Sequence, residues 1–153
     1  MNNKKTVVMM LAISMLMLAV HVGHGQTTQP AKALPNPVLY FMGTELYTAG
    51  GKDWTRYKFG VDNYTAYPDA LFAAAPTLPP CGTNTKSSRT WVDFFDSQGK
   101  RLYGFCALGK ASNLNGIWFA VERDVIPPSY VYIEMNDRQT STKYKSNLAD
   151  TVQ

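Results

Sequence analysis

Histidine is nearly absent from this chain, because its only two copies, His21 and His24, lie close to the N-terminus. If the first 25 residues are removed on export, the remaining chain has none. Catalytic sites of the Ser-His-Asp or Cys-His type are then excluded, since both need an imidazole base. Imidazole metal sites disappear as well, and two cysteines cannot complete a structural zinc site. A phosphate-binding loop is also lacking, because Gly50-Gly51-Lys52 has neither the required spacing nor a following Ser or Thr. We therefore expect no catalytic residue, no metal and no cofactor.

Residues 1–25 have the three parts of a secretory signal peptide. Lys4 and Lys5 form a basic start, an apolar run follows, and Gly23-His24-Gly25 offers the small residues that signal peptidase requires. The apolar run is about 17 residues long, near the lower limit for a membrane-spanning helix, so a retained N-terminal anchor is the alternative. We predict cleavage, a secreted or periplasmic location, and no stable membrane span afterwards.

No large excess of either charge remains after cleavage. The mature chain loses only Lys4 and Lys5 of its 15 basic residues and keeps all 11 acidic ones, which leaves a net charge of about +2. Such a small excess does not indicate a nucleic-acid partner. The remaining length of about 128 residues suits a single domain.

Cysteine is scarce, with only Cys81 and Cys106 in the chain. Two cysteines in an exported protein meet an oxidising environment and can pair. A Cys81–Cys106 disulfide would close a loop of about 26 residues and stabilise the fold by roughly 3 to 3.5 kcal/mol. Two buried thiols are the alternative. A Cys81→Ser change should lower the melting temperature of the oxidised domain, and an unchanged value with thiols titratable in the wild type would contradict the bridge.

Long amphipathic helices are missing too, and short apolar runs with turn signals about every ten residues take their place. Residues 26–37 form a Pro-, Thr- and Ala-rich extended linker, 38–147 the structured domain, and 148–153 a frayed tail. A polar loop with a glycine, Asp96-Ser97-Gln98-Gly99, predicts a hairpin between two of the strands. Residues 69–75 suit a short helical turn. Seven strands are expected: 38–42 with an extension toward 47, 54–62, 90–95, 101–108, 116–121, 130–135 and 143–146.

Seven such strands predict an all-β, antiparallel β-sandwich, with a small barrel as the alternative. At the start of the sixth strand, the segment Ile126-Pro127-Pro128-Ser129-Tyr130-Val131-Tyr132 resembles the corner Leu-x-Pro-x-Thr-x-Tyr of fibronectin type III and related immunoglobulin-like domains. Ile126, Pro128 and Tyr132 match it in one phase. A second alignment of the corner, shifted by one residue, puts Val131 at the tyrosine position. The apolar periodicity of the strand favours this second alignment, because it turns Val131, Ile133 and Met135 toward the core. The resemblance implies a seven-stranded sandwich over 38–147, and says little about function, since that fold carries many.

Aromatic residues are the main candidates for ligand contact. Exposed rings on a sheet or loop stack on sugar faces or anchor a protein partner. Trp91 and Trp118 lie within strands and are expected to be core or sheet-face residues. Trp54, Tyr64 and Tyr67 lie near turns, so we select these three as candidate contacts.

Carboxylates support the alternative of a glycan-active enzyme, which needs two of them roughly 5 to 9.5 Å apart around one sugar ring. Asp93 and Asp96 point to opposite faces of a regular strand, whereas Glu122 and Asp124 share one. Calcium binding at loop ends is a further alternative, for Asp62, Asp69, Asp93, Asp96 and Asp137. Our prediction is an exported, non-catalytic binding or structural protein that recognises a protein partner or an envelope glycan. A structural subunit that pairs through an exposed strand edge is the third alternative.

Overall fold

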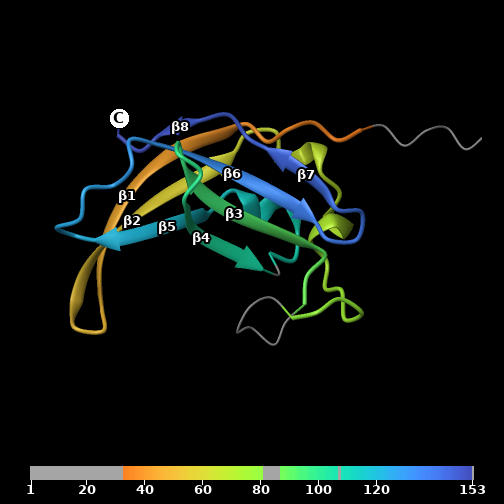
Figure 1. Ribbon diagram of the computed structural model, residues 1–153, viewed down its shortest axis with the longest axis horizontal. Helices are drawn as coiled ribbons and strands as arrows, with labels where there is room; N and C mark the ends of the chain where they lie inside the picture. The colour runs from red at the N-terminus through yellow and green to blue at the C-terminus, as the bar shows by residue number, and fades with distance from the viewer. Residues whose placement is uncertain (1–32, 81–86, 107, 153) are drawn as a thin grey trace, which may run out of the picture. The chain divides into compact units, whose positions relative to one another are not determined.

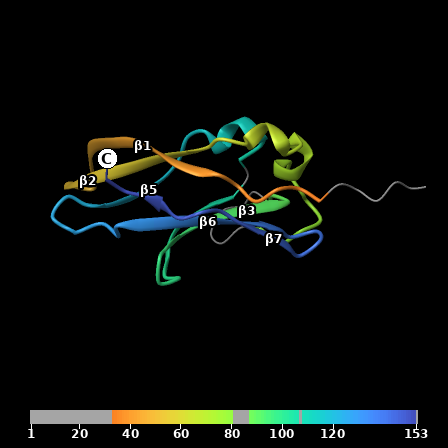
Figure 2. The ribbon, with the colours of Figure 1, turned by 90° about the horizontal axis from the view of Figure 1, so that it is seen from above.

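The computed structural model describes residues 33–80, 87–106 and 108–152. In these ranges the chain forms eight strands in two antiparallel sheets that lie one above the other (Figures 1 and 2). One sheet has the order β1-β2-β5, and the other has the order β4-β3-β6-β7, with β8 also paired to β6. The strands are β1 (Leu39–Ala49), β2 (Lys52–Val61), β3 (Thr90–Asp96), β4 (Arg101–Cys106), β5 (Ile117–Glu122), β6 (Tyr130–Asp137), β7 (Thr142–Lys145) and β8 (Ala149–Asp150).

The expected all-β fold of antiparallel strands is therefore confirmed. The helical turn expected near residues 69–75 is a shorter 3-10 helix, η2 (Asp69–Phe72), and two further 3-10 turns are η1 (Tyr64–Ala66) and η3 (Ala111–Leu114). Leu71 and Phe72 of η2 are buried. These turns supply the apolar side chains that close one end of the sandwich.

The strands β1 and β2 form a long hairpin that extends beyond the expected end of the first strand. Its two-residue turn consists of Gly50 and Gly51, with φ angles of 61° and 74°. Tight hairpin turns need positive φ at both central positions, and glycine adopts it without a steric penalty. The turn thereby fixes the register of the hairpin, in which Trp54 lies opposite Tyr47.

The predicted β3–β4 hairpin is also confirmed, with strands over Thr90–Asp96 and Arg101–Cys106. Gly99 has a φ of 85°, and its N–H donates to the carbonyl of Asp96 at 3.0 Å. The Asp96 carboxylate accepts hydrogen bonds from the backbone N–H groups of Gln98 and Lys100, both at 2.9 Å. The loop is therefore held by its own first residue, as is common for aspartate in turns.

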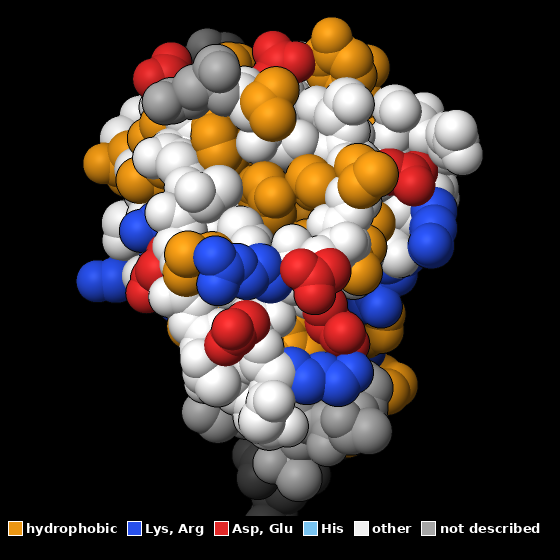
Figure 3. Space-filling view, turned by 90° about the vertical axis from the view of Figure 1, so that its left-hand side faces the viewer, with side chains coloured by type: hydrophobic (Ala, Val, Ile, Leu, Met, Phe, Trp, Pro, Cys, Tyr) orange, Lys and Arg blue, Asp and Glu red, His pale blue; other side chains and the backbone are white. Residues whose placement is uncertain are grey.

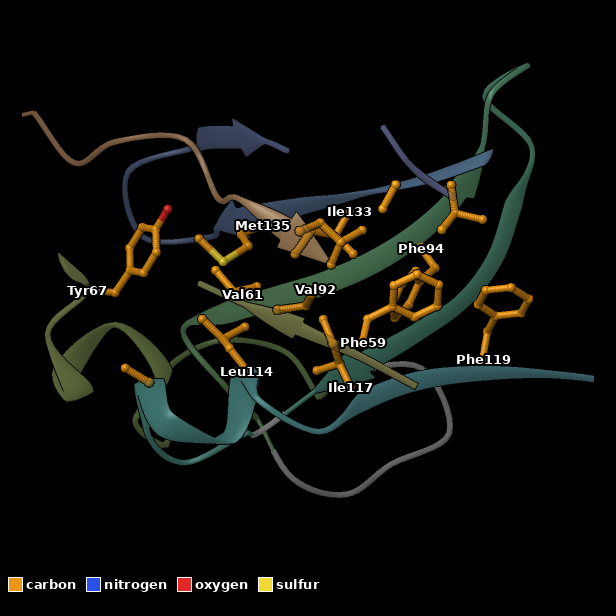
Figure 4. Packing of buried hydrophobic residues seen from close by; sticks show 14 of the residues in the cluster. Phe59, Val61, Tyr67, Val92, Phe94, Leu114, Ile117, Phe119, Ile133 and Met135 are labelled. Carbon is orange, nitrogen blue, oxygen red and sulfur yellow. The ribbon is translucent and has the colours of Figure 1, made fainter. Parts of the chain in front are cut away.

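The core lies between the sheets and is built from alternate residues of each strand (Figure 4). At its centre the ring of Phe59 lies 5.3 Å from that of Phe94 and 5.8 Å from that of Phe119, so β2, β3 and β5 meet there. Such aromatic contacts add to the area that each ring buries. The largest fully buried side chains are Phe59, Phe72, Phe94, Phe119, Leu71, Leu114, Ile117, Ile133, Met135, Val61, Val92 and Val131.

In β6 the structure adopts the phase that periodicity favours. Val131, Ile133 and Met135 are fully buried. Tyr132 points to the opposite face, where its ring stacks on that of Phe95 at 5.3 Å. The phase that places Tyr132 as a buried corner tyrosine is therefore wrong, because it would have turned the apolar side of β6 to solvent.

Two segments that we expected to be loose are packed in their described parts. In the linker, Leu34 contacts the core, and the Tyr67 hydroxyl donates to the Pro35 carbonyl at 2.8 Å. In the tail, β8 pairs with β6, and Thr151 is only 1% exposed. These contacts connect segments distant in the chain, so local composition did not indicate them.

The predicted signal peptide, residues 1–25, lies outside the described residues. Over the ranges that are described, no helix is long and apolar enough to cross a membrane. Cys106 ends β4 and is half-buried, whereas Cys81 also lies outside the described residues. The Cys81–Cys106 bridge therefore stays a prediction.

Candidate ligand-binding hollow

Four aromatic rings from four strands surround one hollow of about 540 Å³. Tyr47 comes from β1, Trp54 from β2, Tyr103 from β4 and Trp118 from β5. We call this feature the aromatic hollow; small residues complete its lining: Ala49, Gly50 and Ala120.

Strand alternation turns these rings away from the core. Ile117 and Phe119 of β5 are buried, so Trp118 between them points to the outer face. In β2, Tyr57 and Phe59 are buried, and Trp54 has the opposite phase. The same alternation that builds the core therefore carries two tryptophans to the outer face of the β1-β2-β5 sheet.

Contacts among the rings hold one wall of the hollow in place. Tyr103 stacks on Trp118 with ring centroids 5.0 Å apart and an interplanar angle of 24°. Phe105 meets both rings edge-on, at 5.1 Å from Tyr103 and 5.9 Å from Trp118. This arrangement joins the two sheets at the β4–β5 edge and fixes the orientation of the rings.

Arg56 lies between two rings of the same face. Its guanidinium carbon is 4.6 Å from the Tyr47 ring centroid and 4.5 Å from that of Trp118. Its Nη1 is 3.3 Å from the Glu45 carboxylate, and the Nζ of Lys58 is 3.7 Å from the same carboxylate. Two cations thus share one anion beside the hollow, which leaves a local excess of one positive charge.

Other polar groups around the hollow occur in pairs of opposite charge. Lys52 Nζ contacts Glu122 Oε1 at 2.5 Å, and both side chains are exposed. A second hollow of about 280 Å³ shares Tyr47 and Trp54 with the first. Its polar lining includes Thr48, whose hydroxyl donates to the Asp53 carboxylate at 2.7 Å. The border of the site therefore offers both hydrogen-bond donors and acceptors.

Of the three predicted contact residues, only Trp54 lines the aromatic hollow. Tyr64 is half-buried and packs against the core. Tyr67 is 3% exposed, so its selection as a contact residue was wrong. Burial raises the pKa of Tyr67 to about 12, and its hydroxyl is used to hold residue Pro35. Both tyrosines lie in loops that pack against the two sheets. The turn-forming residues near them in the sequence did not indicate this packing.

Sequence reasoning missed Tyr47, Tyr103 and Trp118 as members of one site. A signal existed for Trp118, because it lies between Ile117 and Phe119 in an alternating strand and must face outward. Trp91 likewise lies on an outer face, that of the second sheet, where the guanidinium of Arg138 is 4.6 Å from its ring. Both tryptophans are thus sheet-face residues, as expected.

Four of the five aspartates considered for calcium, Asp69, Asp93, Asp96 and Asp137, accept hydrogen bonds from other protein groups. Asp93 accepts from Arg101 at 2.8 Å, and Asp69 accepts from the backbone N–H of Ala111 at 2.9 Å. Asp137 is buried and lies 2.7 Å from Arg89. The hydrogen bond from Arg89 lowers the pKa of the Asp137 carboxyl, against the effect of burial. In the part of the chain that the structure describes, no group of three or more His, Cys, Asp or Glu side chains could hold a metal ion.

A second apolar surface lies at the end of the molecule that is on the left in Figure 1. Figure 3 shows apolar side chains gathered there above a band of charged ones. Ile126, in the loop between β5 and β6, is 91% exposed, and Val125 beside it is 51% exposed. Thr151 near the C-terminus hydrogen-bonds to Pro128 and Ser129 of the same loop.

Comparison with known proteins finds no matching family model, no significant match among curated proteins and none among solved structures.

Proposed function

We propose that this chain is an exported β-sandwich that binds a ligand in the aromatic hollow and has no catalytic activity of its own. The observation that supports this function is the convergence of Tyr47, Trp54, Tyr103 and Trp118 on one hollow. Its volume of about 540 Å³ is in the usual range for ligand pockets. Tryptophan and tyrosine bury a large area with few rotatable bonds, so they dominate binding energy where they cluster.

Rigidity strengthens this proposal. All four rings stand on strands, and Tyr103 and Trp118 are already stacked on each other. A site that is ordered before binding loses little conformational entropy when a ligand enters. The ligand is an envelope glycan or a protein partner, and both use ring faces as anchors.

We also propose that the fold is immunoglobulin-like, of the fibronectin type III kind. If β1 to β7 are taken as strands A, B, C, C′, E, F and G, the sheets become A-B-E and C′-C-F-G. Immunoglobulin domains also group A, B and E apart from C, F and G, and variable domains add C′ to the latter sheet. An experimental structure with another strand order would contradict this assignment.

Export is the part of the proposal that rests on the sequence. The basic start, apolar run and small residues of 1–25 support cleavage and a secreted or periplasmic location. N-terminal sequencing of the exported protein should begin after Gly25. An exported protein whose first residue lies within 1–25 would contradict cleavage after Gly25.

The enzyme alternative requires two carboxylates that face one sugar ring. Near the hollow, Glu122 pairs with Lys52, and Glu45 pairs with both Arg56 and Lys58. Pairing through a strand edge has less support at β1, where the Asn147 side chain bonds both the N–H and the carbonyl of Leu39. These groups are therefore not offered to another strand.

The test is retention of the exported protein on cell-envelope fractions and insoluble polysaccharides. We expect Trp118→Ala to reduce retention at least tenfold. Trp91→Ala is the matched control, because Trp91 is also a half-buried strand tryptophan that contacts an arginine, on the other sheet. Circular dichroism would establish that both variants fold, and Tyr103→Ala replaces Trp118→Ala if the latter does not. Equal retention of the hollow variant and Trp91→Ala would overturn the proposed function.

A further inference from the structure

The aromatic hollow offers ring faces to a ligand, while the polar edge of Trp54 already forms a hydrogen bond within the protein. The indole Nε1–H of Trp54 donates to the Ala49 carbonyl at 3.2 Å. An indole has no other donor, so the ring contributes its apolar face. In the stacked Tyr103–Trp118 pair, Tyr103 and Arg56 both lie against the Trp118 ring, and Tyr103, which is 39% exposed, is the ring of the pair that is open to a ligand.

Small residues line the hollow between these rings: Ala49, Gly50 and Ala120. The Arg56 guanidinium lies beside them, against the Tyr47 and Trp118 rings. A Cβ placed on Gly50 would meet nothing within 4 Å, which shows how open this end of the hollow is. A flat, narrow molecule can therefore lie along the outer face of the sheet, in contact with ring faces.

The border of the hollow is charged, in contrast to its centre. Glu122 and Lys52 lie on one side, and Arg56 with Glu45 lies within the same sheet face. These groups include both donors and acceptors and remain partly exposed, so they can form hydrogen bonds with a ligand that carries many hydroxyl groups. An apolar centre with such a border matches a sugar, which has C–H groups on its ring faces and hydroxyls around its edge.

A protein partner fits the hollow less well. Stable protein interfaces bury about 800 Å² on each side, with roughly 20 to 30 residues. Here seven residues line the hollow, and the apolar surface ends at ion pairs. The hollow alone is thus too small for a stable protein interface, whereas it has room for sugar units that hydrogen-bond to the charged groups beside it.

From this geometry we infer that the hollow binds a β-1,4-linked saccharide chain, with sugar rings stacked on Trp54 and on the Tyr103–Trp118 pair. Chains with this linkage are extended and ribbon-like, which suits an open hollow over a sheet, whereas α-1,4-linked chains coil. This inference rests on the proposed function, because it specifies the ligand of the same site.

Isothermal titration calorimetry with cellohexaose, N-acetylchitohexaose and maltohexaose tests it on the exported protein. We expect saturable binding of at least one of the two β-linked hexasaccharides, and at least tenfold weaker binding of maltohexaose. Trp54→Ala should weaken binding at least tenfold, and Trp54→Phe should restore part of it, because a phenyl ring keeps a stacking face. Trp91→Ala should bind like the wild type.

The outcomes separate this inference from the proposed function. If neither β-linked hexasaccharide binds, while envelope retention still depends on Trp118, the saccharide is overturned and the binding site stands. If a hexasaccharide binds equally well to Trp54→Ala, the placement of the sugar in the hollow is overturned. If envelope retention is also independent of Trp118, both proposals fall.

Discussion

The two sheets of this protein turn different outer faces to solvent. On the β4-β3-β6-β7 sheet the Arg101–Asp93 pair lies over Gly104 so closely that a Cβ there would collide with both side chains. On the β1-β2-β5 sheet the Tyr40 ring covers Gly60 of β2 in the same way, whereas a Cβ at Gly50 in the hairpin turn would meet nothing within 4 Å. Parts of both outer faces are thus covered by their own side chains, and the first sheet also carries an open hollow among its rings.

Both faces use the same chemistry, which makes the difference informative. Each places a cation on an aromatic ring: Arg56 on Trp118 in one sheet, and Lys145 on Tyr132 in the other, at 4.0 Å. In the second sheet Tyr132 also stacks on Phe95. Rings on both faces have such partners, but on the first sheet small residues, Ala49, Gly50 and Ala120, leave a hollow beside them. The presence of aromatic side chains alone therefore does not identify a binding face. The size of the residues beside the rings decides whether a ligand has room there.

The largest effect is expected from the core that both faces share. Phe59→Ala should lower the free energy of unfolding by about 3 to 5 kcal/mol, because it removes a fully buried ring and leaves a cavity. Denaturant unfolding measures this value. Since Phe59 contacts rings of β3 and β5, both outer faces should lose order together. A loss below about 1 kcal/mol would mean that the two sheets do not share this core.

An intermediate effect is expected at the buried ion pair of the second sheet. Asp137→Asn should lower the free energy of unfolding at pH 7 by about 2 to 3 kcal/mol, less than for a fully buried pair, because the Arg89 side chain is 29% exposed. Denaturant unfolding at several pH values, from pH 7 downward, measures the difference in the free energy of unfolding between variant and wild type.

The sign of the pH dependence follows from the lowered pKa of Asp137. A lowered pKa in the folded state stabilises the protein above the unfolded pKa, near 3.8, and this contribution disappears as the pH falls through the folded value. The difference in the free energy of unfolding between wild type and Asp137→Asn should therefore be constant from pH 7 to about 5 and shrink below about pH 4. A gap that widens in acid would contradict the pairing.

The smallest effect sharpens the comparison of the faces directly. Tyr132→Ala removes the stack on Phe95 and should lower the free energy of unfolding by about 1 to 1.5 kcal/mol, with ligand retention unchanged. Trp54→Ala, on the open face, should show the opposite pattern, with a clear loss of retention and a smaller loss of stability. Thermal unfolding and envelope retention of the same two proteins provide the readouts. If Tyr132→Ala reduced retention as strongly as Trp54→Ala, the distinction between the faces would be lost.

The sequence predicted best those strands that have a clear period of two. Phe59 with Val61, and Ile133 with Met135, alternate with polar residues and lie in the core as expected. The hairpin at Asp96–Gly99 was predicted for a similar reason, since its glycine supplies the positive φ. Short β8 was missed because two residues carry no period, and its pairing with β6 depends on a distant segment.

The site was harder to predict than the fold. Trp54 was selected for its position near a turn and does line the hollow, but Tyr67 was selected on the same ground and is buried. Both follow turn-forming residues, and only the packing of distant segments separates them. For Tyr67, the preceding linker places Pro35 within hydrogen-bond distance of its hydroxyl.

By itself the sequence determined the class of the fold, the strands and their inward faces, because alternation and turn chemistry are local properties of the chain. Tertiary structure alone decided which outward rings come together. Tyr47, Trp54, Tyr103 and Trp118 lie up to 71 positions apart and meet only through strand pairing and the approach of β4 to β5. Whether an outward ring is covered or left open depends on its neighbours across the sheet, and the linear sequence does not specify these neighbours.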